Sequence, residues 1–75
     1  MQPYRNLSGT SGVVAFSLGD HHIDIEFQDG HRYRYTYAIP GQQQVEAMKA
    51  LAKTGKGLAT FINQHVREHF AVRLR

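Results

Sequence analysis

The chain has 75 residues, no cysteine and a formal net charge of +3 at pH 7. A chain of this length forms a single domain with a thin core. The lack of cysteine excludes a disulfide framework and every zinc site that needs cysteine, and it fits a cytoplasmic protein. No apolar run approaches the roughly 18 residues of a membrane helix, so we expect no membrane partner.

Residues 1–12 contain residue types that favour turns and have no periodic pattern of apolar residues. We therefore expect a loose lead-in to one domain over residues 13–75. Three segments then alternate apolar and polar residues with a period of two, which predicts three antiparallel strands. In chain order, their apolar positions are Val14, Phe16 and Leu18, then Ile23, Ile25 and Phe27, then Tyr33, Tyr35 and Tyr37.

The pairing of the strands follows from the rule that opposite residues share a face. In the first hairpin, Leu18 opposite Ile23 places Val14 opposite Phe27. In the second hairpin, a two-residue turn at positions 29–30 would set apolar residues against arginines.

A three-residue loop with Gly30 in the left-handed conformation avoids this conflict in the second hairpin. It places Ile25 opposite Tyr33 and makes Arg32 and Arg34 cross-strand partners of Glu26 and Asp24. We therefore interpret the two arginines as charge pairs rather than as a nucleic-acid platform.

Proline and glycine at positions 40–41 end the sheet, and two helices are predicted over residues 43–53 and 58–70. Gly55 is the expected C-terminal stop of the first helix. Val72 and Leu74 near the end indicate a short edge strand or a frayed tail. This order predicts an α+β fold, a three-stranded antiparallel meander followed by two helices on one sheet face.

The positive charge is concentrated in residues 41–75, which hold six of the nine Lys and Arg residues and two of the six Asp and Glu residues. Lys49, Lys53 and Lys56 are typical of a solvated helix flank, but they also fit phosphate binding.

Asn63 and Arg67 lie four residues apart on the polar side of the second predicted helix, where core packing requires neither. A guanidinium beside an amide suits phosphate or carboxylate, although an exposed polar face explains both residues as well. Arg73 and Arg75 add positive charge near the end of the chain.

His65 and His69 have the spacing of a two-histidine metal site. No third ligand can be named, and helical steps of about 100° place both inside the apolar arc. We therefore expect packed or partly buried histidines and no metal or other cofactor. No arrangement of nucleophile and base, or of paired carboxylates, is recognisable, so we expect no catalysis.

Three short features are shared with a known family: the Y-x-Y of Tyr33 and Tyr35, the Ile39-Pro40 that follows, and residues 62–67, which look like an F-N-x-x-I-R segment. Over roughly residues 12–70 the chain resembles the KTSC family, short domains found alone in bacterial proteins and at the C-terminus of some lysyl-tRNA synthetases. The resemblance implies the fold, and the synthetase context implies RNA binding.

Two classes of function fit these observations. One is a protein-interaction or self-associating domain that uses the C-terminal strand and the apolar arc of the second helix. The other, favoured by the uneven charge, is a non-catalytic module that binds RNA or other nucleic acid. Its expected contacts are Lys49, Lys53, Lys56, Asn63, Arg67, Arg73 and Arg75.

Overall fold

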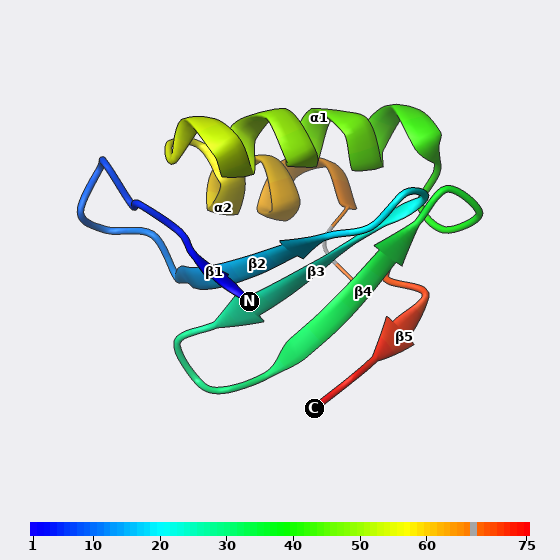
Figure 1. Ribbon diagram of the computed structural model, residues 1–75, viewed down its shortest axis with the longest axis horizontal. Helices are drawn as coiled ribbons and strands as arrows, with labels where there is room; N and C mark the ends of the chain where they lie inside the picture. Colours follow the sequence, from blue (N-terminus) through cyan, green and yellow to red (C-terminus); the bar gives the residue numbers. More distant parts are fainter. Residues whose placement is uncertain (67) are drawn as a thin grey trace.

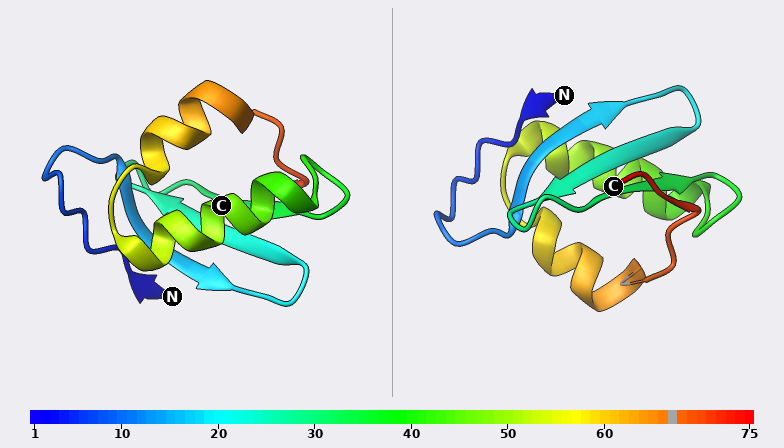
Figure 2. Two further views of the ribbon diagram at one scale, coloured as in Figure 1. Left: turned by 90° about the horizontal axis from the view of Figure 1, so that it is seen from above. Right: turned by 90° about the horizontal axis from the view of Figure 1, so that it is seen from below.

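The computed structural model of the protein describes residues 1–66 and 68–75. Within these residues, five antiparallel strands form one sheet in the order β1-β2-β3-β4-β5, and the helices cover one side of it (Figure 1 and Figure 2). This confirms the predicted α+β fold. The elements are β1 Gln2–Pro3, β2 Val13–Leu18, β3 His22–Phe27, β4 Arg32–Thr36, α1 Gln42–Thr54, α2 Leu58–Phe61, the π-helical turn η1 Ile62–Val66, and β5 Val72–Arg73.

The hairpin between β3 and β4 has the predicted register. Ile25 lies opposite Tyr33, and Gly30 has a φ of 89°. The amide of Gly30 donates to the carbonyl of Phe27 at 2.9 Å, which closes the loop. The left-handed glycine therefore keeps the apolar residues of both strands on the helix-covered face.

The predicted register of the first hairpin is confirmed next to the loop, where Leu18 lies opposite Ile23. It is wrong at the other end of the two strands. A β-bulge between Val13 and Ala15 places Val13, not Val14, opposite Phe27. Val13 is 1% exposed and Val14 is 38% exposed. A bulge adds one residue to one strand, so the residues beyond it point to the opposite face from the one that strict alternation predicts.

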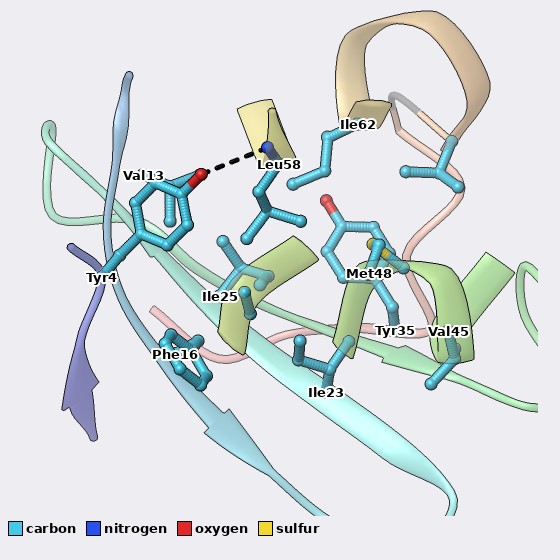
Figure 3. Packing of buried hydrophobic residues seen from close by; sticks show 12 residues of the cluster. Tyr4, Val13, Phe16, Ile23, Ile25, Tyr35, Val45, Met48, Leu58 and Ile62 are labelled. Atoms are coloured by element: carbon cyan, nitrogen blue, oxygen red, sulfur yellow. Dashed lines mark hydrogen bonds between the residues drawn. The ribbon is translucent and has the colours of Figure 1, made fainter. Parts of the chain in front are cut away.

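The expectation that residues 1–12 form a loose lead-in is wrong. β1 pairs with β2 at the sheet edge, and Tyr4, which follows β1 in the chain, is buried. The hydroxyl of Tyr4 accepts a hydrogen bond from the amide of Leu58 at 3.2 Å (Figure 3). The amide of Leu7 donates a hydrogen bond to the carbonyl of Gly55 at 2.7 Å. This segment therefore connects β1 to the loop between the helices.

The core lies between the sheet and the helices (Figure 3). Its largest fully buried side chains come from β2, β3, β4, α1, α2 and η1, and each contributes about 1.5–3 kcal/mol through burial. They are Val13, Ile23, Ile25, Tyr35, Val45, Met48, Leu58 and Val66.

The first helix ends as predicted. Gly55 has a φ of 85°, and its amide donates to the carbonyl of Leu51. The second helix differs from the prediction, because α2 ends at Phe61 and the π-helical turn η1 follows. Hydrogen bonds from i to i+5 widen the turn and lower the rotation per residue below the α-helical value of about 100°.

This change of helix type overturns the expectation for the two histidines. His65 lies in the π-helical turn and His69 lies beyond it, and both are exposed instead of packed into the apolar arc. Ile62 and Val66 remain buried, at 3% and 1% exposure. The reduced rotation per residue thus carries His65 away from the buried side.

The end of the chain forms the predicted edge strand. β5 pairs with β4, with Arg73 opposite Tyr33 and Val72 opposite Arg34. Because opposite residues share a face, Arg73 lies on the side of the helices and Val72 on the open side of the sheet. None of the described helices has both the length and the apolar character to cross a membrane.

Candidate nucleic-acid interface

A groove of about 1060 Å³ opens between the sheet and the π-helical turn η1. Phe27, Tyr33 and Tyr35 line its sheet side, and Ile62 and Val66 line its helix side. This volume lies slightly above the usual range for ligand sites, about 300–1,000 Å³. The other lining residues are Asn63, Gln64, His65, Glu68, His69, Phe70 and Arg73.

Aromatic rings form the floor of the groove. Tyr33 and Phe70 lie with ring centroids 4.4 Å apart and ring planes inclined by 35°. Phe27 also contacts Tyr33, with ring centroids 5.9 Å apart and ring planes inclined by 64°. All three side chains are half-buried, so they are packed and still accessible. Such rings supply flat apolar surfaces on which a planar ligand group can stack.

Tyr35 lies deeper in the groove than its neighbour Tyr33. Burial, together with the nearby Tyr33, raises the pKa of Tyr35 to about 12. The phenol therefore stays neutral at ordinary pH and keeps an O–H that can donate a hydrogen bond.

The helix-side rim of the groove is polar. Asn63, Gln64 and His65 are exposed on η1. The ring of His65 packs on Phe61 with centroids 4.6 Å apart and planes inclined by 35°. Amides carry both donors and acceptors, which suits the edges of unpaired bases.

Arg73 brings a positive charge to the sheet-side end of the groove. Its Nη2 lies 2.8 Å from Nδ1 of His31, which belongs to the turn between β3 and β4. The main-chain oxygen of Arg75 lies 3.3 Å from the same Nδ1. The groove thus combines an aromatic floor, an amide rim and a guanidinium.

Lys49 does not belong to this site, although the sequence favoured it as a contact. Its Nζ donates to the carbonyl oxygens of Gly19 at 2.7 Å and Asp20 at 3.2 Å. It also pairs with Glu46 at 3.1 Å, and its side chain is only 13% exposed. The ammonium therefore fastens the β2–β3 loop to α1.

Lys53 and Lys56 are exposed but lie away from the groove. Nη2 of Arg5 donates to the carbonyl of Lys53 at 2.5 Å. Arg5 follows β1, and β1 and β5 are the two opposite edges of the sheet. Figure 1 likewise has the α1–α2 connection at the left and β5 at the lower right. The predicted basic residues therefore do not form one surface.

Of the predicted contacts, Asn63 and Arg73 line the same groove, and Arg75 lies next to Arg73 with its side chain exposed. Arg67 lies outside the described residues. The sequence interpretation missed the groove itself, because Tyr33 was assigned to the core. A tyrosine on a strand near the sheet edge, with a second aromatic residue such as Phe70 just after the last helix, is the signal that could have found it.

Comparison with protein-family models, curated proteins and solved structures found no match. The resemblance to the KTSC family therefore stays a prediction. Within residues 1–66 and 68–75, no group of three or more His, Cys, Asp or Glu side chains is placed to hold a metal ion.

Proposed function

We propose that the protein is a non-catalytic module that binds single-stranded nucleic acid, RNA above all, in the groove between β4 and η1. The observation that carries this proposal is the pair of Tyr33 and Phe70, whose rings pack on each other at a tilt, together with the guanidinium of Arg73 that lines the same groove. Aromatic surface next to positive charge is the combination that holds unpaired bases and their phosphates.

Each part of the groove has a task in this proposal. A base stacked on an aromatic side chain contributes about 1–3 kcal/mol, largely independent of sequence. Arg73 faces the phosphate that follows the stacked base, and the amides of Asn63 and Gln64 hydrogen-bond to base edges. A duplex fits poorly, because its bases are already stacked on one another.

The overall charge supports the same ligand class. The chain has a net charge of +3 and a pI near 9.6. The exposed Lys53 and Lys56 raise the local positive potential and steer a polyanion without contacting it in the groove. RNA as the ligand and a cytoplasmic, bacterial setting also agree with the KTSC resemblance, which supports this part of the proposal.

The second candidate is a protein-interaction or self-associating domain, favoured by exposed apolar side chains on β5 and just after it. Val72 is 47% exposed and Leu74 is 41% exposed. The strand is short, however, and two copies of β5 paired antiparallel would bring the arginines of residues 73–75 close together. Like charges across strands are destabilising, so self-pairing at this edge is disfavoured.

Fluorescence anisotropy with labelled oligonucleotides tests the proposal. Single-stranded RNA and DNA should bind at low salt, and a duplex of the same length should bind more weakly. Phe70→Leu removes one stacking surface while keeping apolar volume, and it should lower the affinity about tenfold, equivalent to 1.4 kcal/mol. Phe61→Leu is the matched control, because Phe61 does not line the groove. No binding at tens of micromolar protein would leave protein interaction as the better account.

A further inference from the structure

A smaller cavity adjoins the groove at the β3–β4 loop, at the lower left of Figure 1. Its volume is about 420 Å³, and it is lined by Gly12, Phe27, Gln28, Asp29 and Tyr33. We call this cavity the loop pocket. Phe27 and Tyr33 also line the groove, so the two cavities are neighbours that share these two rings. A strand bound in the groove can therefore continue into the loop pocket.

The two shared rings offer surfaces to more than one base. The planes of Phe27 and Tyr33 are inclined by 64°, so their faces point in different directions. One planar base cannot cover both faces. The volume of the loop pocket lies in the lower part of the usual range for ligand sites, which suits a single base rather than a longer segment. We therefore expect one further nucleotide of the strand in this pocket.

Hydrogen bonds to the main chain fix the polar wall of the loop pocket. The amide of Gln28 donates to the carbonyl of Gly12 at 2.8 Å, and the amide of Phe27 donates to the carbonyl of His31 at 2.9 Å. The Gln28 side chain is held as well, because its Nε2 donates to the carbonyl of Ser11 at 3.4 Å. The wall is thus ordered before a ligand binds, which lowers the entropic cost of binding.

Asp29 brings a carboxylate with remaining acceptor capacity to this wall. Its Oδ1 accepts a hydrogen bond from the amide of His31 at 3.0 Å, and its Oδ2 lies 3.7 Å from Nε2 of the same residue, beyond hydrogen-bond distance. A carboxylate has about four acceptor sites and no donor, so both oxygens can accept further hydrogen bonds. Because a carboxylate repels phosphate, Asp29 suits the edge of a base and not the backbone of the strand.

The four bases of RNA present different groups to such a wall. On its Watson–Crick edge, guanine has two neighbouring N–H donors, at N1 and N2, beside the acceptor O6. Adenine, cytosine and uracil each have a single donor group with an acceptor next to it, so an acceptor would face the carboxylate. Gln28 adds a donor that matches O6, because its Nε2 has a second N–H that the contact to Ser11 leaves unused.

We infer that the loop pocket binds a guanine base and that Asp29 and Gln28 recognise its Watson–Crick edge. The carboxylate of Asp29 accepts hydrogen bonds from N1–H and N2–H, and the amide of Gln28 donates to O6. This inference rests on the proposed function, since the guanine belongs to the strand in the groove. Stacking on the aromatic floor holds any base, whereas the loop pocket selects one.

Binding of short uridine strands with one variable nucleotide tests this selectivity. The strand with guanine should bind about tenfold more tightly than those with adenine, cytosine or uracil at that position. Inosine lacks the N2 amino group and should fall between them. Asp29→Asn keeps an acceptor for the His31 amide but replaces one carboxylate oxygen by a donor, so it should remove most of the guanine preference. It should not weaken binding of the strand that contains uridine alone.

Asp20→Asn is the matched control, because it makes the same change of charge in the exposed loop between β2 and β3. This variant should keep the full preference for guanine. A preference that persists in Asp29→Asn, or equal affinity for all four strands, would overturn the guanine pocket even if RNA binds in the groove.

NMR titration with guanosine monophosphate tests the loop pocket without an RNA strand. The amide signals of Gln28 and Asp29 should shift more than with the monophosphates of adenosine, cytidine and uridine, which carry the same phosphate. Asp29→Asn should abolish this difference. Guanosine-specific shifts at the loop pocket without binding of any RNA strand would support the pocket and refute the proposed function. Equal shifts with all four nucleotides would contradict the pocket.

Discussion

The carboxylate of Asp24 on β3 accepts two hydrogen bonds from the guanidinium of Arg34 on β4, at 2.8 Å from Nε and 3.0 Å from Nη2. Asp24 is only 7% exposed although it lies on the open side of the sheet. The same contact raises the pKa of Arg34, first through the hydrogen bond and then through the charge of Asp24. Arg34 is therefore a structural residue, as its place opposite Asp24 predicted.

Arg34→Ala should lower the free energy of unfolding by about 2 kcal/mol, because it leaves a nearly buried carboxylate without its partner. Arg32→Ala is the matched control. The ion pair of Arg32 with Glu26 has a longer N–O distance, 3.3 Å, and Glu26 is more exposed than Asp24. Urea unfolding should show the larger loss for Arg34, while RNA affinity stays unchanged in both variants. Equal losses would show that the bidentate geometry adds nothing.

Lys49 and Lys53 should behave differently, although they lie one turn apart on α1. Lys49→Met removes the ammonium that holds the β2–β3 loop, and it should lower stability by about 2 kcal/mol and the Tm by roughly 10 °C. Lys53→Met changes an exposed side chain and should stay within about 0.5 kcal/mol. Thermal unfolding followed by circular dichroism measures both. A neutral Lys49 variant with weakened RNA binding would restore the original sequence interpretation of this residue.

Tyr35 should be among the last tyrosines to ionise, because burial raises its pKa to about 12. A folded-state pKa above the unfolded value of about 10 means that this contribution to stability is complete below pH 10 and is lost as the pH rises towards 12. Absorbance at 295 nm follows tyrosinate formation. Tyr35→Phe should delete a step near pH 12, and loss of a step near pH 10 instead would contradict the buried position.

The electrostatic part of the proposed RNA binding should show in its salt dependence. The logarithm of the affinity should fall with the logarithm of the salt concentration by about 0.7 per phosphate contacted on a single strand. Arg73→Ala should flatten that slope by roughly one contact, whereas Lys53→Ala should change it less. An unchanged slope in the Arg73 variant would exclude a phosphate contact at this end of the groove.

The strand pairing was predictable because the alternation of apolar residues leaves few registers. A two-residue turn would have set Ile25 opposite Arg34, and Gly30 offered the one loop that avoided this. The bulge was not predictable, because Val13 and Val14 are adjacent valines and either can take the inward position. β1 was missed since Gln2 and Pro3 carry no strand signature and are held by tertiary contacts.

The candidate site was less predictable than the fold. The predicted positions of the histidines assumed α-helical rotation throughout the second helix. That assumption does not hold in η1, which begins at Ile62. The basic residues were grouped by sequence proximity, but Lys49 is engaged with the carbonyl of Gly19. The packing of Phe70 on Tyr33 contributes to the groove, and that contact joins residues far apart in the chain.

The central claim is that single-stranded RNA binds in the groove between β4 and η1. Chemical-shift mapping of the labelled protein with a short single-stranded RNA tests it most directly, because it reports the location of binding as well as its occurrence. The account predicts the largest changes at Tyr33, Asn63, Phe70 and Arg73, and small ones at Lys53 and Lys56. Changes confined to the α1–α2 connection, or to the open side of the sheet at Arg34 and Val72, would contradict it.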